Sequence, residues 1–180
     1  MGSNTSPDEI LSVFDQQRNI INELPRSVVR AEPKMHWHGV ADIFVVDDQG
    51  RILCSKRSER MQNNPNKWQV RFGGHVKAGQ SFLQTTINEL AEEAGLHATQ
   101  ETLIPLESGS KAKYLVHYSY FVYHILPTDQ IQLNDGEVAE TRWMTVPEYL
   151  KSHAQEPDIW CKNLHSQTLQ ALMAHIAQRG

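Results

Sequence analysis

Runs of apolar residues separated by short polar breaks predict β-strands in the first half of the chain. The apolar run at 39–46 has the length and the β-branched content of a buried strand. A later polar stretch contains Asn63-Asn-Pro-Asn66, which is typical of a loop. The predicted elements are a strand at 39–46, a turn at 47–50, a hairpin partner at 51–56, a loop at 57–67 and a short strand at 68–72 that ends at Gly73-Gly74.

The clearest signals in the chain are those of a helix that follows this loop. Apolar residues recur at helical spacing, at Leu83, Ile87, Leu90 and Ala94. Ser81 and Gln84 form the S-x-x-Q pattern of a capping box at its start. Gly95 stands where a glycine commonly ends a helix.

The second half of the chain adds further strands and helices. The patterns predict strands at 113–126 and 140–144, a short helix opened by a second capping box at Thr145-Val-Pro-Glu148, and a closing amphipathic helix at about 159–178. Strands lie on both sides of the central helix in the sequence. We therefore expect an α/β (α+β) fold, an α/β/α sandwich around a mixed β-sheet.

The first 35 residues are mixed and polar. Residues Ser12–Asn19 are expected to form a short strand or a turn, and Pro25 and Pro33 break any long element. With 180 residues the chain has the size of one domain. We expect residues 1–35 to be an N-terminal extension that packs on a domain of residues 36–180.

Composition narrows the function classes. The net charge of −4 and the sequence pI near 6.1 argue against a nucleic-acid polymer as partner. Cys54 and Cys161 lack a Cys-x-x-Cys spacing, so neither a zinc knuckle nor a disulfide framework is expected. No apolar run approaches the roughly 18 residues of a membrane span, and the N-terminus is polar. We expect a cytoplasmic protein without a membrane partner.

Three glutamates on the central helix are the main candidate site. Glu89, Glu92 and Glu93 are spaced i, i+3 and i+4, so they lie on one side of a helical turn. A solvent-exposed acidic face is one interpretation. The preceding loop, Gly73–Gly79, favours another, because its three glycines let the backbone approach a ligand closely. Carboxylates are ligands for Mg²⁺ or Mn²⁺, so the pattern indicates hydrolysis of phosphoanhydrides.

The segment 74–96 resembles the signature of the Nudix hydrolases, G-x5-E-x7-R-E-U-x-E-E-x-G-U, where U is aliphatic. The residues that match it, without a gap, are Gly74, Glu89, Leu90, Glu92, Glu93, Gly95 and Leu96. The resemblance implies that Glu89, Glu92 and Glu93 bind Mg²⁺ or Mn²⁺ and that Glu89 and Glu93 are catalytic. It also implies cleavage of a diphosphate bond in a nucleoside diphosphate linked to another group, or in a related small diphosphate.

Two positions depart from the signature. Gln80 stands where the family has Glu, and Asn88 stands where it has Arg. We expect the two amides to hydrogen-bond to each other as a neutral pair, which keeps shape while losing charge. We then expect the site to retain metal binding, with a lower metal affinity or a lower reaction rate. A catalytically weakened Nudix domain that binds a ligand or a protein is the alternative.

A second resemblance is to the Nudix branch related to isopentenyl-diphosphate isomerase. It is carried by His38, Gly50–Arg57, Trp68 and Gly74-His75-Val76. In that branch, histidines at the positions of His38 and His75 bind a metal, which suggests a second metal site here. The isomerase reaction itself needs a cysteine where this chain has Gly73, so the isomerase alternative is disfavoured.

The remaining candidate residues lie outside the predicted helix that carries the three glutamates. Gly73 and Gly74 are expected to position substrate phosphates, and Arg57 and Arg71 to bind them as bidentate donors. In related proteins an acidic residue of this region completes the metal site or acts as the base; the resemblance makes Glu137 a candidate for that role, with Glu140 as an alternative. The aromatic residues Trp68, Tyr118, Tyr120 and Phe121 are expected in the core. The sequence leaves the substrate and the oligomeric state open, a homodimer being one alternative.

Overall fold

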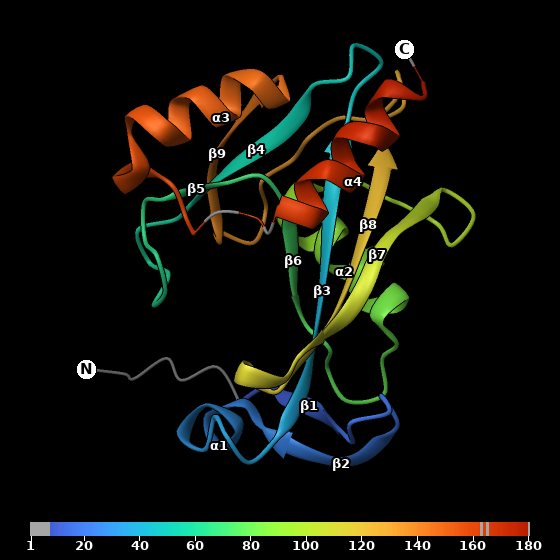
Figure 1. Cartoon of the computed structure of the whole chain (residues 1–180), viewed down its shortest axis with the longest axis vertical. Coiled ribbons are helices and arrows are strands. Elements are labelled where there is room, and N and C mark those ends of the chain that lie inside the picture. Colours follow the sequence, from blue (N-terminus) through green and yellow to red (C-terminus); the bar gives the residue numbers. More distant parts are fainter. Residues whose placement is uncertain (1–7, 163, 165, 180) are drawn as a thin grey trace.

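A mixed β-sheet of nine strands forms the centre of the molecule, with four α-helices around it (Figure 1). The computed structural model describes residues 8–162, 164 and 166–179. The strands in this part of the chain are β1 (Ile10–Phe14), β2 (Ile20–Pro25), β3 (Trp37–Val46), β4 (Ile52–Arg57), β5 (Trp68–Gln69), β6 (Phe72–His75), β7 (Leu103–Lys111), β8 (Val116–His124) and β9 (Val138–Met144). The α-helices are α1 (Arg26–Ala31), α2 (Phe82–Ala94), α3 (Val146–Gln155) and α4 (Ser166–Ala177), and 3₁₀ turns lie at Ala112–Tyr114 and Pro157–Ile159.

Strand β3 organises the sheet because four other strands pair with it. It runs parallel to β8 over its whole length, from His38 opposite Val116 to Val46 opposite His124. Its other edge pairs antiparallel with β6, which places Gly73 and Gly74 beside the middle of β3. Strands β1 and β4 join its two ends. Parallel and antiparallel pairs in one sheet confirm the expected mixed topology.

Both faces of the sheet are covered, because successive residues of β3 point to opposite sides. Ile43 packs in a cluster with Leu90 of α2, and Phe44 packs in a second cluster with Leu172 of α4. All four side chains are fully buried. Figure 1 shows α4 in front of β3 and α2 behind it. The layers are those of the α/β/α sandwich that the sequence predicts.

The N-terminal segment enters the same sheet. Strand β1 pairs with β2 along its length and with β3 at Val13–His38 and Phe14–Trp37. The stretch expected to be a short strand or a turn contains both, since β1 ends at Phe14 and a turn follows. The division of the chain into an extension of residues 1–35 and a domain of residues 36–180 remains a prediction.

The structure corrects three expectations about elements and adds one strand that was not expected. The single strand expected at 68–72 is two strands, because a bend at Val70 moves the chain from β4 to β3. The expected hairpin of β3 and β4 has one paired position, Val46–Ile52, since β4 turns away to pair with β9. Strand β7 was not predicted; Pro105 and Gly109 obscure its pattern, and it pairs only with β8. The closing helix starts at Ser166 rather than near 159, after the turn at Pro157–Ile159.

No helix in the described part of the chain is long and apolar enough to cross a membrane.

Candidate active site

Helix α2 is fixed at both ends by its own sequence. The Ser81 side chain accepts a hydrogen bond from the Gln84 backbone N–H at 3.1 Å, and Gly95 ends the helix in a left-handed conformation with φ of 66°. Only half of the expected capping box forms here. The Gln84 amide instead donates to the Asn88 side chain at 2.9 Å, one helical turn further on.

The three glutamates of α2 differ sharply in exposure. Glu89 and Glu93 are buried, at 8% and 3% exposure, while 54% of the Glu92 side chain is exposed. Glu93 accepts a hydrogen bond from the Gly73 N–H at 3.0 Å. Glu89 lies so close to Gly74 that a Cβ there would stand 2.8 Å from its carboxyl atoms. Glu89 and Glu93 are therefore turned toward the glycine pair of β6, and only Glu92 of the three remains largely exposed to solvent.

A lysine that the sequence analysis did not single out lies among these carboxylates. The Lys77 Nζ is 3.2 Å from Glu89 Oε1, 3.5 Å from Glu92 Oε2 and 3.4 Å from Glu9 Oε1. Its place in the glycine-rich loop, three residues after Gly74, was a usable signal. No such signal exists for Glu9, because nothing in the sequence indicates that residue 9 lies near residue 89.

Burial shifts the pKa values of the ionisable side chains in the site. Burial raises the pKa of Glu89 to about 7, and Lys77 partly opposes this shift. Burial, together with the charge of Glu89, raises the pKa of Glu93 well above its ordinary value. Burial lowers the pKa of Lys77, but the negative charges of Glu89, Glu92 and Glu9 outweigh this effect, so the pKa of Lys77 is raised. A positive charge at this place is therefore strongly favoured.

The donor set fits a hard divalent cation. Within the described residues, no three acidic, histidine or cysteine side chains already converge in a metal-binding arrangement. The ammonium of Lys77 lies at the carboxylate oxygens instead and marks where a cation is stabilised. Oxygen donors suit Mg²⁺ or Mn²⁺, and the lack of a side chain at Gly74 makes room for the Glu89 carboxylate.

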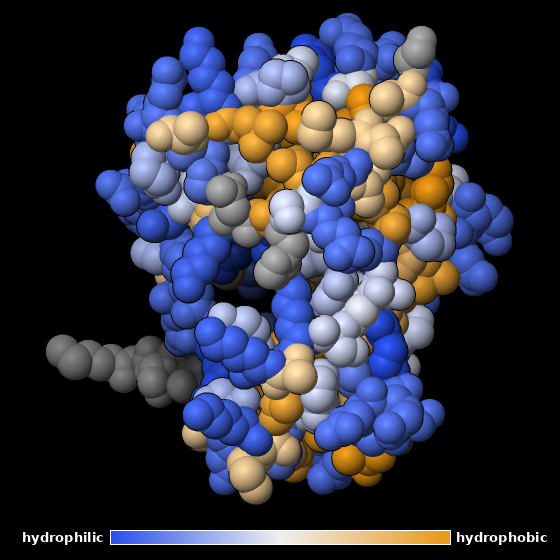
Figure 2. Space-filling view, viewed as in Figure 1, coloured by the Kyte–Doolittle hydropathy of each residue, from blue (hydrophilic) through white to orange (hydrophobic). Residues whose placement is uncertain are grey.

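A polar cavity of about 610 Å³ brings most of the predicted residues together. Its lining includes Arg57, Arg71, Gly73, Gly74, His75, Glu89, Glu92, Glu93 and Glu137. Unpredicted members are Glu9, Arg26, Lys77, Asp135 and Lys162. Figure 2 shows a hollow bordered by hydrophilic residues between the part formed by β1, β2 and α1 and the part that carries α3. The cavity lining thus combines the carboxylates of α2 with basic groups from other elements.

The two predicted phosphate-binding arginines already contact protein groups. Arg71 Nε is 2.9 Å from the buried carboxylate of Asp42, and burial raises the pKa of Asp42 although Arg71 opposes the shift. The Arg57 Nε donates to the Asn63 carbonyl at 3.0 Å. Both guanidinium groups are held in place beside the cavity, so their donors are oriented before any substrate arrives.

The histidine pair is brought together. The rings of His38 and His75 stack with centroids 5.4 Å apart. Burial lowers the pKa of both, to about 3 for His75, so both imidazoles are neutral near pH 7. The Nδ1 of His38 is buried without a hydrogen-bond partner among the described residues. His75 lines the cavity, whereas His38 is not part of its lining.

The expected pair of Gln80 and Asn88 does not form. The side-chain amide oxygen of Gln80 accepts from the Thr85 hydroxyl at 2.9 Å, and the Asn88 side chain accepts from the Gln84 side chain. The reason is the cap at Ser81, which leaves Gln80 before the helix while Asn88 lies two turns along it. Each amide is therefore satisfied by a side chain near it in the sequence, Gln80 by Thr85 and Asn88 by Gln84.

Glu137 and Glu140 occupy different places. Glu137 lies in the loop before β9 and lines the cavity, where burial and Asp135 raise its pKa. Glu140 pairs with Lys56 at 3.7 Å and is absent from the lining. Of the two, Glu137 is in reach of a ligand.

The structure defines a class of protein: an α/β sandwich with a polar cavity, in which a helix with buried carboxylates faces a strand that carries two glycines. The chain belongs to the Nudix family, because the NUDIX domain matches residues 36–164.

Curated relatives carry the same family name, and a solved structure shares the fold. An uncharacterized Nudix hydrolase of Clostridium acetobutylicum is 31% identical over 100 residues, 54% of this chain and 47% of that protein, so the chain spans less than half of that relative. An uncharacterized Nudix hydrolase of Rhodococcus erythropolis is 27% identical over 158 residues, 83% of this chain and 84% of that protein. A crystal structure of a Deinococcus radiodurans protein has a TM-score of 0.70 at 17% identity and covers 92% of this chain and 98% of its own, which shows the shared fold.

The suggested isomerase branch has one distant counterpart. A protein of Photorhabdus laumondii named isopentenyl-diphosphate Delta-isomerase 2 is 24% identical over 170 residues, 85% of this chain and 86% of that protein. A Cβ at Gly73, whose φ is +137°, would stand 2.2 Å from the Ala41 carbonyl, so this backbone excludes a side chain there. Cys54 is fully buried, and burial raises its pKa to about 12.

Proposed function

We propose that this protein is a metal-dependent hydrolase that cleaves a diphosphate bond in a small molecule. One observation carries the proposal: two buried glutamates of α2, Glu89 and Glu93, face the glycine pair of β6 in a polar cavity. Burying a carboxylate without an ion-pair partner is costly. Glu93 has no such partner among the described residues, while Glu89 pairs with Lys77, so this cluster suits a site that receives a cation.

Glu89, Glu92 and Glu93 would hold Mg²⁺ or Mn²⁺. When bound, such an ion offsets phosphate charge and lowers the pKa of an attacking water. Glu93 is oriented by the Gly73 N–H, and Glu89 is the further ligand or orients the water. Glu137, which lines the cavity and whose pKa is raised by burial, is the candidate base.

The rest of the cavity would bind the substrate. The backbone at Gly73 and Gly74 approaches the phosphates, and Arg57 and Arg71 contribute charged donors from the neighbouring wall. A nucleoside diphosphate linked to another group is the substrate class that we favour. The stacked, neutral His38 and His75 are candidates for a second metal, which Mn²⁺ or Zn²⁺ titration of a His38→Gln, His75→Gln variant would test as a loss of one binding site.

Turnover of a substrate panel tests the proposal. The purified protein is mixed with Mg²⁺ or Mn²⁺ and nucleotide sugars, dinucleoside polyphosphates, nucleoside triphosphates, ADP-ribose, NADH, coenzyme A and isopentenyl diphosphate, and phosphate release is read with a coupled phosphatase. We expect metal-dependent turnover that a Glu92→Gln, Glu93→Gln variant lacks. Glu140→Gln is the matched control, because Glu140 lies outside the cavity lining.

A binding module without turnover is the second candidate, and the uncharged residues Gln80 and Asn88 favour it. It predicts heat of binding for one member of the panel in calorimetry, with no product at high protein concentration. Product formation that requires the metal would exclude this candidate. Isomerisation of isopentenyl diphosphate is not expected, since Gly73 cannot carry an acid.

A further inference from the structure

Lys77 is the cation at the centre of the carboxylate cluster. Its Nζ lies within 3.5 Å of an oxygen of Glu89, Glu92 and Glu9, and 27% of its side chain is exposed. Two of these partners belong to α2 and one precedes β1, so a single ammonium group joins the helix to the N-terminal segment. Its neighbours in the cavity thus include the residues proposed to hold the metal.

The backbone around Lys77 is anchored on both sides. The Ser12 N–H donates to the Val76 carbonyl at 3.0 Å, and the Ala78 N–H donates to the Ile10 carbonyl at 2.9 Å. The Ser12 hydroxyl also donates to the Lys77 carbonyl at 3.3 Å. Strand β1 therefore holds the loop so that only the flexible stem of Lys77 is free to move.

A divalent ion and this ammonium need the same oxygens. An ion held by Glu89 and Glu92 would lie next to Lys77, and like charges at such a distance repel strongly in a partly buried site. Lys77 has four rotatable side-chain bonds and can swing away while its backbone stays fixed. Binding the ion then breaks the three ion pairs of Lys77.

We infer that Lys77 is a tethered cation that neutralises the carboxylates in the metal-free protein and competes with the divalent ion, so that it sets the metal affinity of the site. The inference rests on the proposed function for the identity of the metal site. It makes Lys77 a positioning residue for the carboxylates, and it accounts for how the buried Glu89 carboxylate is tolerated in the absence of metal.

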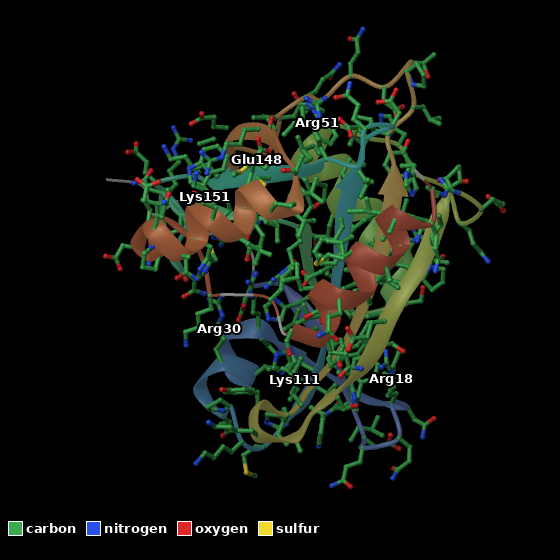
Figure 3. All side chains as sticks on the ribbon, turned by 45° about the horizontal axis from the view of Figure 1, so that its top comes forward. Arg18, Arg30, Arg51, Lys111, Glu148 and Lys151 are labelled. Atoms are coloured by element: carbon green, nitrogen blue, oxygen red, sulfur yellow. The ribbon has the colours of Figure 1, made fainter. Side chains whose placement is uncertain are left out.

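Titration of Mn²⁺ into the protein without substrate tests the inference. Isothermal calorimetry compares the wild type with Lys77→Met, which keeps length and loses charge, and Lys77→Arg, which keeps charge. Exposed ion pairs are individually weak, so the loss of three predicts about tenfold tighter Mn²⁺ binding by Lys77→Met. Lys77→Arg stays near the wild type. Lys151→Met, on α3 and outside the cavity lining, is the matched control for net charge and also stays near the wild type (Figure 3).

Thermal melting in EDTA gives the second readout. Lys77→Met is expected to melt at a lower temperature than the wild type, because its carboxylates repel one another, and added Mn²⁺ restores more of its stability than that of the wild type. Unchanged or weaker Mn²⁺ affinity in a folded Lys77→Met protein overturns the inference. The proposed function fails separately, by the absence of metal-dependent turnover in the wild type, since neither Mn²⁺ titration nor melting involves a substrate.

Discussion

At the scale of single residues, the spacing between Gly74 and Glu89 has a direct consequence. In Gly74→Ala, the new Cβ would stand 2.8 Å from the Glu89 carboxyl atoms. These atoms end a side chain, so the fold adapts by moving Glu89, and the free energy of unfolding in urea changes by less than about 1 kcal/mol. If the proposed metal-dependent hydrolysis takes place, the displaced carboxylate is expected to lower its kcat/KM by about 100-fold.

Gly73→Ala is the instructive comparison for this prediction. A Cβ there meets the Ala41 carbonyl of the backbone, which cannot move aside, so this variant loses stability as well as activity. Full turnover by Gly74→Ala would show that the position of Glu89 against β6 does not matter for the reaction.

The candidate site was predictable where its residues share one local pattern. Glu89, Glu92 and Glu93 were found because helical spacing alone places them on one face. The spacing does not reveal that Glu92 is exposed while Glu89 and Glu93 are buried. This difference follows from how α2 packs on β6. Glu9 and Arg26 reach the cavity through strand pairing, and no local pattern encodes that contact.

At the scale of elements, the cap of α3 forms as its sequence predicts. The Glu148 N–H donates to the Thr145 hydroxyl at 3.3 Å, and the Glu148 carboxylate accepts from the Thr145 N–H at 2.7 Å. Thr145→Ala removes the acceptor and is expected to lower the free energy of unfolding by about 1 kcal/mol. Denaturation in urea measures it. Thr145→Ser retains a hydroxyl and should stay near the wild type; an equal loss there would point to the methyl group rather than the cap.

The contact between β8 and α4 makes stability depend on pH. The Nε2 atoms of His124 and His175 lie 2.8 Å apart, so one ring must donate and the other accept. Burial and the charge of Arg179 lower the pKa of both from 6.5. The unfolded chain therefore binds more protons below pH 6.5, and stability falls as the pH drops through that value.

Replacement of one ring isolates this effect. His175→Gln keeps a hydrogen-bonding group that does not titrate, so its melting temperature should fall less between pH 7.5 and pH 5 than that of the wild type. His97→Gln, a change at a histidine outside this contact, serves as the control and should retain the full fall. Identical pH profiles for His175→Gln and the wild type would contradict the role of the pair.

Elements were predicted well where a long apolar or periodic run dominates, as in β3 and α2. Strand β7 escaped because Pro105, Gly109 and several polar residues interrupt its pattern, which a strand paired on one side tolerates. The split into β5 and β6 depends on where β4 turns away from β3, and this is a property of the sheet and not of residues 68–72.

At the scale of the whole molecule, Arg18 ties the N-terminal turn to the sheet. Its guanidinium donates to the carbonyls of Gly109 and Tyr118 at 3.2 Å and to the Ser119 hydroxyl at 2.9 Å. Figure 3 shows it where the turn after β1 meets β7. Arg18→Ala is expected to lower the free energy of unfolding by about 2 kcal/mol, because charged hydrogen bonds at a part-buried site are lost.

Urea denaturation of Arg18→Ala beside Arg30→Ala checks this prediction. Arg30, on α1, bonds only the exposed Gln62 side chain at 3.2 Å among the contacts described, and its removal should change the unfolding free energy by less than about 0.5 kcal/mol. Equal effects of the two variants would mean that the Arg18 contacts do not hold the N-terminal segment in place.

The parallel pairing of β3 with β8 also constrains the order in which the molecule can assemble. Strands β4 to β7 and helix α2 lie between the two partners in the chain. A ribosome therefore releases β3 long before β8 exists to cover its edge, and the growing chain carries an open, strongly apolar strand during that interval. Long-range closure of this kind makes folding slow compared with helical proteins of similar size. Chaperone supply and expression temperature should accordingly govern the yield of native protein.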